Sequence, residues 1–160
     1  MQVERVTQAD LQDVLALNEA SVPHVNSLSM ARLRWFAEHA AYFSVVRVDG
    51  ALAGFLIGLG PDLDYASPNY RYFCQRHEVF GYVDRVVVAP TARRLGVGSQ
   101  LYDDFAATLR GFAPVMTCEV NIRPSNDGSM AYHEQHGFRQ VATQETENGS
   151  KMVALMEKRL

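Results

Sequence analysis

Blocks of alternating and periodic apolar residues follow one another along this chain, and they predict strands and helices in mixed order. Residues 3–6 indicate a short strand, and residues 11–20 carry apolar side chains at mostly helical spacing, which predicts a first helix. Thr7 is followed three residues later by Asp10. This spacing is typical of a helix N-cap with a carboxylate at the N3 position.

The next blocks predict a second helix, a hairpin and a long connection. Ser29 is suited to cap a helix that continues with three apolar positions, Leu33, Trp35 and Phe36. Residues 41–60 form two β-rich runs separated by Asp49-Gly50, a dipeptide that favours a type I′ turn. Residues 61–77 have little periodicity and several aromatic side chains. They predict a connection without secondary structure, of a kind that is usually functional or disordered.

The second half of the chain predicts a strand, a helix and another strand, over residues 78–89, 98–110 and 114–122. Asn126 is suited to cap a short helix that ends at Gly137, a residue that favours the left-handed position after a helix. Two further strands follow, with Asn148-Gly149 at the turn between them. The order β α α β β (loop) β α β α β β predicts an α/β sandwich with a mixed sheet.

Composition narrows the class of protein. The chain has 160 residues, of which 48% are apolar, enough for the core of a single domain over residues 1–160. A net charge of −3 argues against nucleic acid as a partner, because phosphate backbones bind basic surfaces. Cys74 and Cys118 lack CxxC spacing, so we expect no metal or redox site and a reduced, cytoplasmic protein. No signal peptide and no 18-residue apolar run is found, so we expect no membrane partner.

The stretch ARRLGVGSQL, residues 92–101, follows the Val-rich strand and opens a predicted helix. The first N–H groups of a helix have no intrahelical partner and carry a partial positive charge. Gly96 and Gly98 have no Cβ atom, so a phosphate can approach the backbone there. Arg93 and Arg94 can add charge-assisted hydrogen bonds. The stretch therefore predicts a pyrophosphate site.

Two other phosphate motifs do not fit these residues. A P-loop ends in GK[ST], but Gly98 is followed by Ser99 and Gln100. A dinucleotide fingerprint needs a third glycine at the position that Leu101 occupies. A plain strand–turn–helix with glycines at a tight bend stays open as the alternative.

Two segments of the chain resemble motifs of the GNAT N-acetyltransferase superfamily. Arg93-x-x-Gly96-x-Gly98 resembles its acetyl-CoA signature, [RQ]-x-x-G-x-[GA]. A later segment resembles N-x-x-[SA]-x-x-[FL]-Y-x-x-x-G-F through Asn126, Ser129, Tyr132, His133, Gly137 and Phe138. The resemblance covers most of the chain. It implies an α/β fold with a mixed, mostly antiparallel sheet of six to seven strands, about four helices on its faces and a splay at the fourth strand.

The resemblance also implies that acetyl-CoA is the cosubstrate. The loop that would hold its pyrophosphate comprises Arg93, Arg94, Leu95, Gly96, Val97, Gly98 and Ser99. The pantetheine arm would pair with the backbone of Val86, Val87 and Val88. Asn126 is the family's polar contact with the cofactor, a role compatible with a helix N-cap. Ser129 is a further cofactor-binding candidate, with packing at the helix start as its other role.

Acetyl transfer requires a neutral amine, donors for the oxyanion and a proton for the leaving thiolate. The simplest oxyanion donor is a backbone N–H near Val87 or Val88. The family's usual proton-donating tyrosine lies four residues before Gly137, and this chain has His133 there. An imidazole donates a proton near neutral pH more readily than a phenol. His133 is therefore the candidate donor, with a non-catalytic histidine as the alternative and Tyr132 as a second donor.

A base or a water relay helps to deprotonate the amine, because a free alkylammonium titrates at about 10.4. Glu119 is the first candidate, since strand alternation places it on the polar face of its strand. Asp84 and Glu78 compete with it, although Asp84 is also suited to a salt bridge with Arg85. A water relay without one essential base stays open.

The sequence therefore predicts an N-acetyltransferase that moves acetyl from acetyl-CoA to a primary amine by direct attack in a ternary complex. The acceptor is a small-molecule amine or a peptide or protein amine. Aromatic residues of the second helix and of residues 61–77 are candidates to line its pocket. A homodimer is an open alternative for the assembly. A non-catalytic acyl-CoA-binding sensor or regulatory module is the alternative function, and a nucleotide-binding protein is a third.

Overall fold

The computed structural model describes all 160 residues, which form two compact units. The first unit comprises Met1–Leu59 and Asp84–Thr108, and the second comprises Gly60–Val83 and Leu109–Leu160. The first contains β1 (Gln2–Arg5), α1 (Leu11–Ala20), α2 (Met30–His39), β2 (Tyr42–Val48), β3 (Ala51–Leu59) and nearly all of α4 (Val97–Leu109). The second contains α3 (Pro68–Arg76), β5 (Val115–Arg123), α5 (Asp127–Gln135), β6 (Arg139–Thr146) and β7 (Lys151–Arg159). The strand β4 (Gly81–Val88) contributes to both units.

The strand order is β1-β2-β3-β4-β5-β7-β6. Strand β4 runs parallel to β5, with Gly81 opposite Met116 and Tyr82 opposite Thr117. The pairs β1–β2, β2–β3, β5–β7 and β6–β7 are antiparallel. These pairings confirm the predicted mixed, mostly antiparallel sheet of six to seven strands. The sheet has seven strands, and the chain has five α-helices, where about four were predicted. The predicted splay of β4 stays an expectation.

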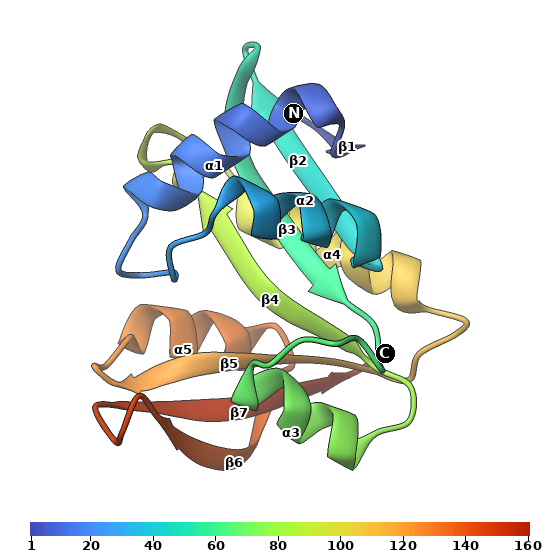
Figure 1. Ribbon diagram of the computed structural model, residues 1–160, viewed down its shortest axis with the longest axis vertical. Helices are drawn as coiled ribbons and strands as arrows, with labels where there is room; N and C mark the ends of the chain where they lie inside the picture. Colours follow the sequence, from blue (N-terminus) through green and yellow to red (C-terminus); the bar gives the residue numbers. More distant parts are fainter. The chain divides into compact units, whose positions relative to one another are not determined.

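In the first unit, α4 packs against β3 through two glycines of that strand. A Cβ atom on Gly58 would lie 2.4 Å from the ring of Phe105, and one on Gly54 would lie 2.8 Å from the side chain of Val97. Both distances are too short for ordinary van der Waals contact, so the close packing requires glycine at these positions. Figure 1 shows α1 and α2 in front of this strand and α4 behind it. Residues 53–59 of β3 are accordingly all buried.

Three local predictions are confirmed. The backbone N–H of Thr7 donates to Oδ2 of Asp10 over 2.8 Å, as expected of a capped helix start. Asp49 and Gly50 have φ values of 51° and 79°, both positive as a type I′ turn requires. Gly137 has a φ of 90°, the left-handed conformation expected after α5.

The prediction that residues 61–77 lack secondary structure is wrong, because α3 lies within them. Ser67 caps this helix by accepting a hydrogen bond from the N–H of Tyr70, and Pro68 occupies its first turn. Tyr70 and Phe73, one turn apart, are both 0% exposed. These two aromatic residues therefore belong to the core of the second unit and do not line an acceptor pocket. A helix of nine residues is too short for its periodicity to stand out in the sequence.

A buried carboxylate ties the end of α3 to β7. The side chain of Glu157 is 5% exposed and accepts a hydrogen bond from Nε of Arg76 over 2.7 Å and another from Nε2 of His77. Burial alone would raise the pKa of Glu157, but the hydrogen bonds from Arg76 and His77 outweigh it and hold this pKa below its usual value. The ionised form of Glu157 therefore stabilises the folded state.

The first prediction concerns stability and pH. Because the folded-state pKa of Glu157 is lowered, its contribution is complete above the unfolded value of about 4.3 and is lost as pH falls below it. We expect Glu157→Gln to lower the free energy of unfolding at pH 7 by ~1–3 kcal/mol. The difference from the unmodified chain should shrink towards pH 3, as measured by urea unfolding. Glu145→Gln, at an exposed ion pair with Arg123, is the matched control and should change little. A Glu157 difference that is constant with pH would contradict the prediction.

Candidate functional site

The loop between β4 and α4 carries two exposed arginines just before the start of the helix. After the 3₁₀ turn Pro90–Ala92, Arg94 and Gly96 both adopt left-handed φ values, 66° and 81°. The N–H of Gln100 makes the first i→i−4 hydrogen bond of α4, to the carbonyl of Gly96 at 3.0 Å. The N–H groups of the residues between them lie in the first turn, where intrahelical acceptors are lacking. Arg93 and Arg94 are exposed and have no ion-pair partner in the chain.

The two glycines of this loop are not required by packing. A Cβ atom on Gly96 would have no atom within 4 Å, and one on Gly98 would meet only Cγ2 of Val88, at 3.8 Å. Open space therefore lies against the bare backbone, in contrast to Gly54 and Gly58. A polyanion that approaches the helix start closely would use this space. The loop thus fits the pyrophosphate group that the sequence predicted for residues 93–99.

Strand β4 leads directly into this loop. Val87 is 4% exposed and packs in the core, whereas Val86 and Val88 are half-buried. The N–H of Ala89 donates to the carbonyl of Ala53 at 2.8 Å, which joins the end of β4 to β3. The first unit therefore brings together the valines proposed for the pantetheine arm and the loop proposed for the pyrophosphate.

Asp84 on β4 is held in an ion pair. Its Oδ2 accepts a hydrogen bond from Nε of Arg85 at 2.9 Å, and the two side chains are 4% and 7% exposed. This is the salt bridge expected from the sequence. A buried carboxylate that is already paired with a guanidinium is a weaker candidate for a base.

Arg85 also fixes the connection between α1 and α2, residues 21–29. Its Nη1 donates to Oδ1 of Asn18 and to the carbonyl of Asn26, both at 2.9 Å. Asn18 in turn donates to Glu19 at 2.9 Å, and Glu19 accepts a hydrogen bond from the N–H of Leu28 at 3.2 Å. Asn18 is 0% exposed and Arg85 is 8% exposed, whereas Glu19 and Asn26 lie at the surface, so the network reaches from the core to the surface.

In the second unit, Glu119 on β5 is half-buried and accepts a hydrogen bond from a tyrosine. The phenol of Tyr82 donates to Oε2 of Glu119 at 2.7 Å. Tyr82 lies on β4, where its ring is 1% exposed. Sequence analysis placed Glu119 on the polar face of its strand but missed Tyr82. Only the pairing of β4 with β5 brings the two together.

Helix α5 carries the residues of the second motif. Asn126 caps it, accepting a hydrogen bond at Oδ1 from the N–H of Ser129 at 3.2 Å. Nδ1 of His133 lies 2.7 Å from the carbonyl oxygen of Ser129. A carbonyl oxygen only accepts, so Nδ1 carries the proton and Nε2 is the nitrogen that titrates. The ring of Tyr132 stacks on that of His136 with centroids 4.0 Å apart.

His133 is neutral at pH 7. Burial lowers its pKa below the usual value, and the charge of His136 adds to this effect, while the hydrogen bond to Ser129 opposes it. Nε2 must therefore gain a proton before His133 can donate one. The role of His133 as the proton donor stays a prediction, and it requires that Nε2 is protonated first.

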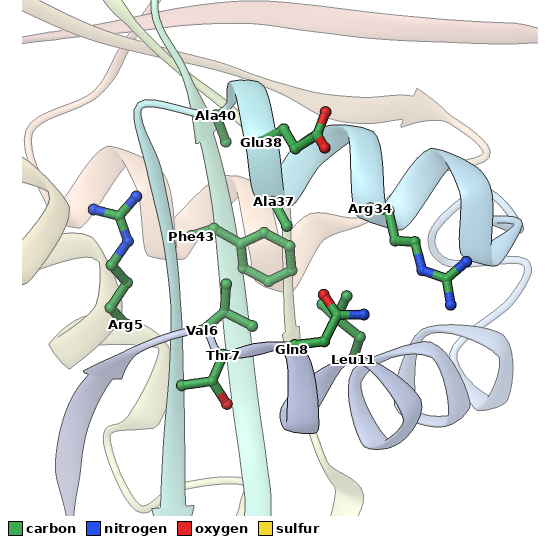
Figure 2. A pocket seen from close by; sticks show the side chains of 10 residues that line it. All are labelled: Arg5, Val6, Thr7, Gln8, Leu11, Arg34, Ala37, Glu38, Ala40 and Phe43. Carbon is green, nitrogen blue, oxygen red and sulfur yellow. The ribbon is translucent and has the colours of Figure 1, made fainter.

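A separate pocket in the first unit contains none of the predicted site residues. It has a volume of about 290 Å³ and lies between α2, β2 and the turn that precedes α1. Figure 2 shows the ring of Phe43 at its centre, with the guanidinium groups of Arg5 and Arg34 pointing away from the ring on opposite sides.

No group of three or more His, Cys, Asp or Glu side chains is arranged to hold a metal ion. No helix is both long enough and apolar enough to span a membrane.

A mixed sheet with a parallel pair at β4–β5 is followed by an arginine–glycine loop at the start of a helix. These features define a mixed α/β protein with this loop at its surface. Residues 11–138 match the family model described as the acetyltransferase (GNAT) family. The match covers more than half of the chain, so the chain belongs to the GNAT acetyltransferase family. No curated protein matches the chain by sequence.

Three solved structures share this fold. Ard1 from Thermoplasma volcanium superposes with a TM-score of 0.77 at 20% identity, covering 99% of this chain and 97% of that chain. The ribosomal-protein-S18-alanine N-acetyltransferase from Escherichia coli gives a TM-score of 0.74 at 15% identity, covering 99% and 92%. Naa20 from Chaetomium thermophilum, in complex with a bisubstrate analogue, gives 0.75 at 22% identity, covering 100% and 87%. At these identities the likeness establishes the fold alone.

Proposed function

We propose that this chain is an N-acetyltransferase that moves the acetyl group of acetyl-CoA to a primary amine by direct attack in a ternary complex. The observation that carries the proposal is the loop 93–99, where two exposed arginines flank glycines that have open space beside them at the start of α4. Membership of the GNAT family supports the same chemistry.

Acetyl-CoA supplies an activated thioester, and the first unit holds it. The N–H groups of Gly98 and Ser99 bind pyrophosphate oxygens, and the guanidinium groups of Arg93 and Arg94 add charge-assisted hydrogen bonds. Val97, which is 1% exposed, packs in the core beneath the loop. The extended backbone of residues 86–88 pairs with the pantetheine arm. Asn126 remains a further polar contact, compatible with its place at the cap of α5.

The chemical step requires a base, an oxyanion donor and a proton donor for the thiolate. Glu119 takes the proton that the attacking ammonium loses. A backbone N–H at Val87 or Val88 stabilises the oxyanion. Nε2 of His133, which carries no proton in the neutral form, takes the proton that the attacking nitrogen releases once the C–N bond has formed and passes it to the thiolate as the C–S bond breaks. The proton held by Glu119 leaves to solvent. Tyr132, stacked on His136, is the second candidate for the donor.

The acceptor is a primary amine of a small molecule, peptide or protein. One structural neighbour is named as acting on the alanine of ribosomal protein S18, which supports testing peptide N-termini beside small amines. A non-catalytic acyl-CoA sensor is the second candidate function. The buried, neutral His133 favours it, because the family's usual position for a proton-donating tyrosine is occupied by a different group.

The function is tested by two measurements on the full chain. Calorimetric titration with CoA and with ATP establishes which polyanion binds. A thiol-release assay with acetyl-CoA and a panel of small amines and N-terminal peptides establishes turnover. We expect tighter binding of CoA than of ATP, and turnover with at least one acceptor. CoA binding without turnover on any acceptor would favour the sensor, and tighter ATP binding would contradict the proposal.

The second prediction tests whether the loop 93–99 binds CoA. Gly98→Val places a branched side chain in the open space against the helix start, and we expect CoA affinity to fall about tenfold or more, ~1.4 kcal/mol. Gly98→Ala is the matched control, since the family signature admits alanine there. A Cβ atom at position 98 meets no atom closer than 3.8 Å, so we expect thermal unfolding of the two variants to change little. Equal CoA affinity of the two variants, measured by calorimetry, would mean that the loop does not contact the ligand.

A further inference from the structure

We propose that Tyr82 is the positioning residue for Glu119, holding one carboxylate oxygen so that the other takes the proton from the attacking amine. This inference rests on the proposed function. The phenol of Tyr82 donates to Oε2 of Glu119 at 2.7 Å, the length of a strong hydrogen bond to a carboxylate. Tyr82 is 1% exposed while Glu119 is half-buried, so the donor lies in the core and the acceptor is partly accessible to solvent.

Packing from α3 immobilises the ring of Tyr82. Its centroid lies 5.5 Å from that of Tyr70 at an interplanar angle of 63°, and 6.0 Å from that of Phe73. Tyr70 is itself anchored, because its hydroxyl donates to the carbonyl of Gly60 at 2.7 Å and accepts from the N–H of Leu63 at 3.0 Å. Close-packed aromatic rings of this kind leave the phenol a single position.

The backbone register places the carboxylate opposite that phenol. Tyr82 is paired with Thr117, and Glu119 lies two residues further along β5, on the same face. The hydroxyl of Thr117 donates to the carbonyl of Gly81 at 2.9 Å, which locks β4 against β5 at this point. The hydrogen bond between Tyr82 and Glu119 is therefore imposed by the sheet.

The chemical consequence follows from the direction of the hydrogen bond. A phenol that donates to a carboxylate favours its ionised form and orients it. With Oε2 engaged by Tyr82, Oε1 becomes the oxygen that accepts the proton. A base that is held in one orientation reacts faster than a base that rotates freely, because it is aligned with the amine more of the time.

The experiment compares two variants that each remove one buried phenolic hydroxyl from the same aromatic cluster. Tyr82→Phe removes the donor to Glu119, and Tyr70→Phe is the matched control because its hydroxyl bonds to Gly60, Leu63 and Cys74. We expect kcat of Tyr82→Phe to fall about tenfold, with an unchanged KM for acetyl-CoA. The acidic limb of its pH–rate profile should move to higher pH. Without the hydrogen bond from Tyr82, the protonated form of Glu119 is less disfavoured and its pKa rises. Tyr70→Phe should keep the unmodified profile.

A double variant separates positioning from structure. If Tyr82 acts through Glu119, the combination of Tyr82→Phe with Glu119→Gln should be no slower than Glu119→Gln alone. If Tyr82→Phe does not fold, Glu119→Asp tests the same contact, since its shorter side chain withdraws from the phenol and should move the acidic limb in the same direction.

Each outcome decides a different claim. A Tyr82→Phe variant whose rate and pH profile match those of Tyr70→Phe overturns the positioning role alone. Additive losses in the double variant overturn it as well. An unmodified chain that binds CoA but turns over no acceptor overturns the proposed function, and this inference with it.

Discussion

Replacing Glu119 by glutamine is expected to lower kcat for an alkylamine acceptor at pH 7 by ~10²–10⁴-fold, the usual contribution of a general base. Glutamine has the same shape, and its amide oxygen can still accept the hydrogen bond of Tyr82. The variant therefore loses the proton acceptor while its local packing is kept. The measurement is thiol release under saturating acetyl-CoA, with the KM for acetyl-CoA expected to stay the same because the loop 93–99 is untouched.

The size of this loss should depend on the acceptor and on pH. An alkylammonium titrates at about 10.4, so almost none of it is neutral at pH 7, whereas an α-amino group titrates at about 7.7–8.0. Activity of Glu119→Gln should therefore rise with pH and be less impaired with a peptide N-terminus than with an alkylamine. Glu78→Gln, at an exposed carboxylate considered for the same role, is the control and should retain the unmodified rate. An undiminished rate of Glu119→Gln with an alkylamine at pH 7 would place the base elsewhere.

The parts of the fold that could be predicted are those encoded by neighbouring residues. The hairpin at Asp49-Gly50 follows from two residues that tolerate positive φ, and the left-handed Gly137 follows from the end of a short helix. The arginine-glycine loop is also local, because its glycines and its helix start are contiguous in the chain. These features were predictable since each depends on a few adjacent residues.

The parts that could not be predicted depend on pairing between distant segments. Helix α3 could not be recognised in the sequence, because its polar residues outnumber Tyr70 and Phe73, the two that are buried. The contact of Tyr82 with Glu119 requires the register of β4 with β5, which no local pattern specifies. The tautomer of His133 follows from a carbonyl one helical turn earlier, a backbone partner that carries no sequence signal.

The network around Arg85 also joins residues that are far apart in the sequence. Its disruption has the largest expected effect on stability. Arg85 on β4 is 8% exposed and joins Asp84, Asn18 and the carbonyl of Asn26. Removing the guanidinium leaves the carboxylate of Asp84 and the amide of Asn18 buried with fewer partners. Breaking a buried ion pair from one side costs ~3–5 kcal/mol, a large share of the ~5–15 kcal/mol that stabilises a typical domain.

We therefore expect Arg85→Met, which keeps most of the side-chain volume, to lower the free energy of unfolding by ~3–5 kcal/mol in urea titrations. Arg110→Met is the matched control, because Arg110 is exposed and lies outside the network; it should change stability by less than ~0.5 kcal/mol. Adding Asp84→Asn to Arg85→Met should recover part of the loss, since no uncompensated charge then stays buried. Hydrogen exchange of residues 21–29 should also accelerate, because Asn26 loses its tie to β4. An Arg85→Met variant as stable as Arg110→Met would show that the α1–α2 connection holds its conformation without this network.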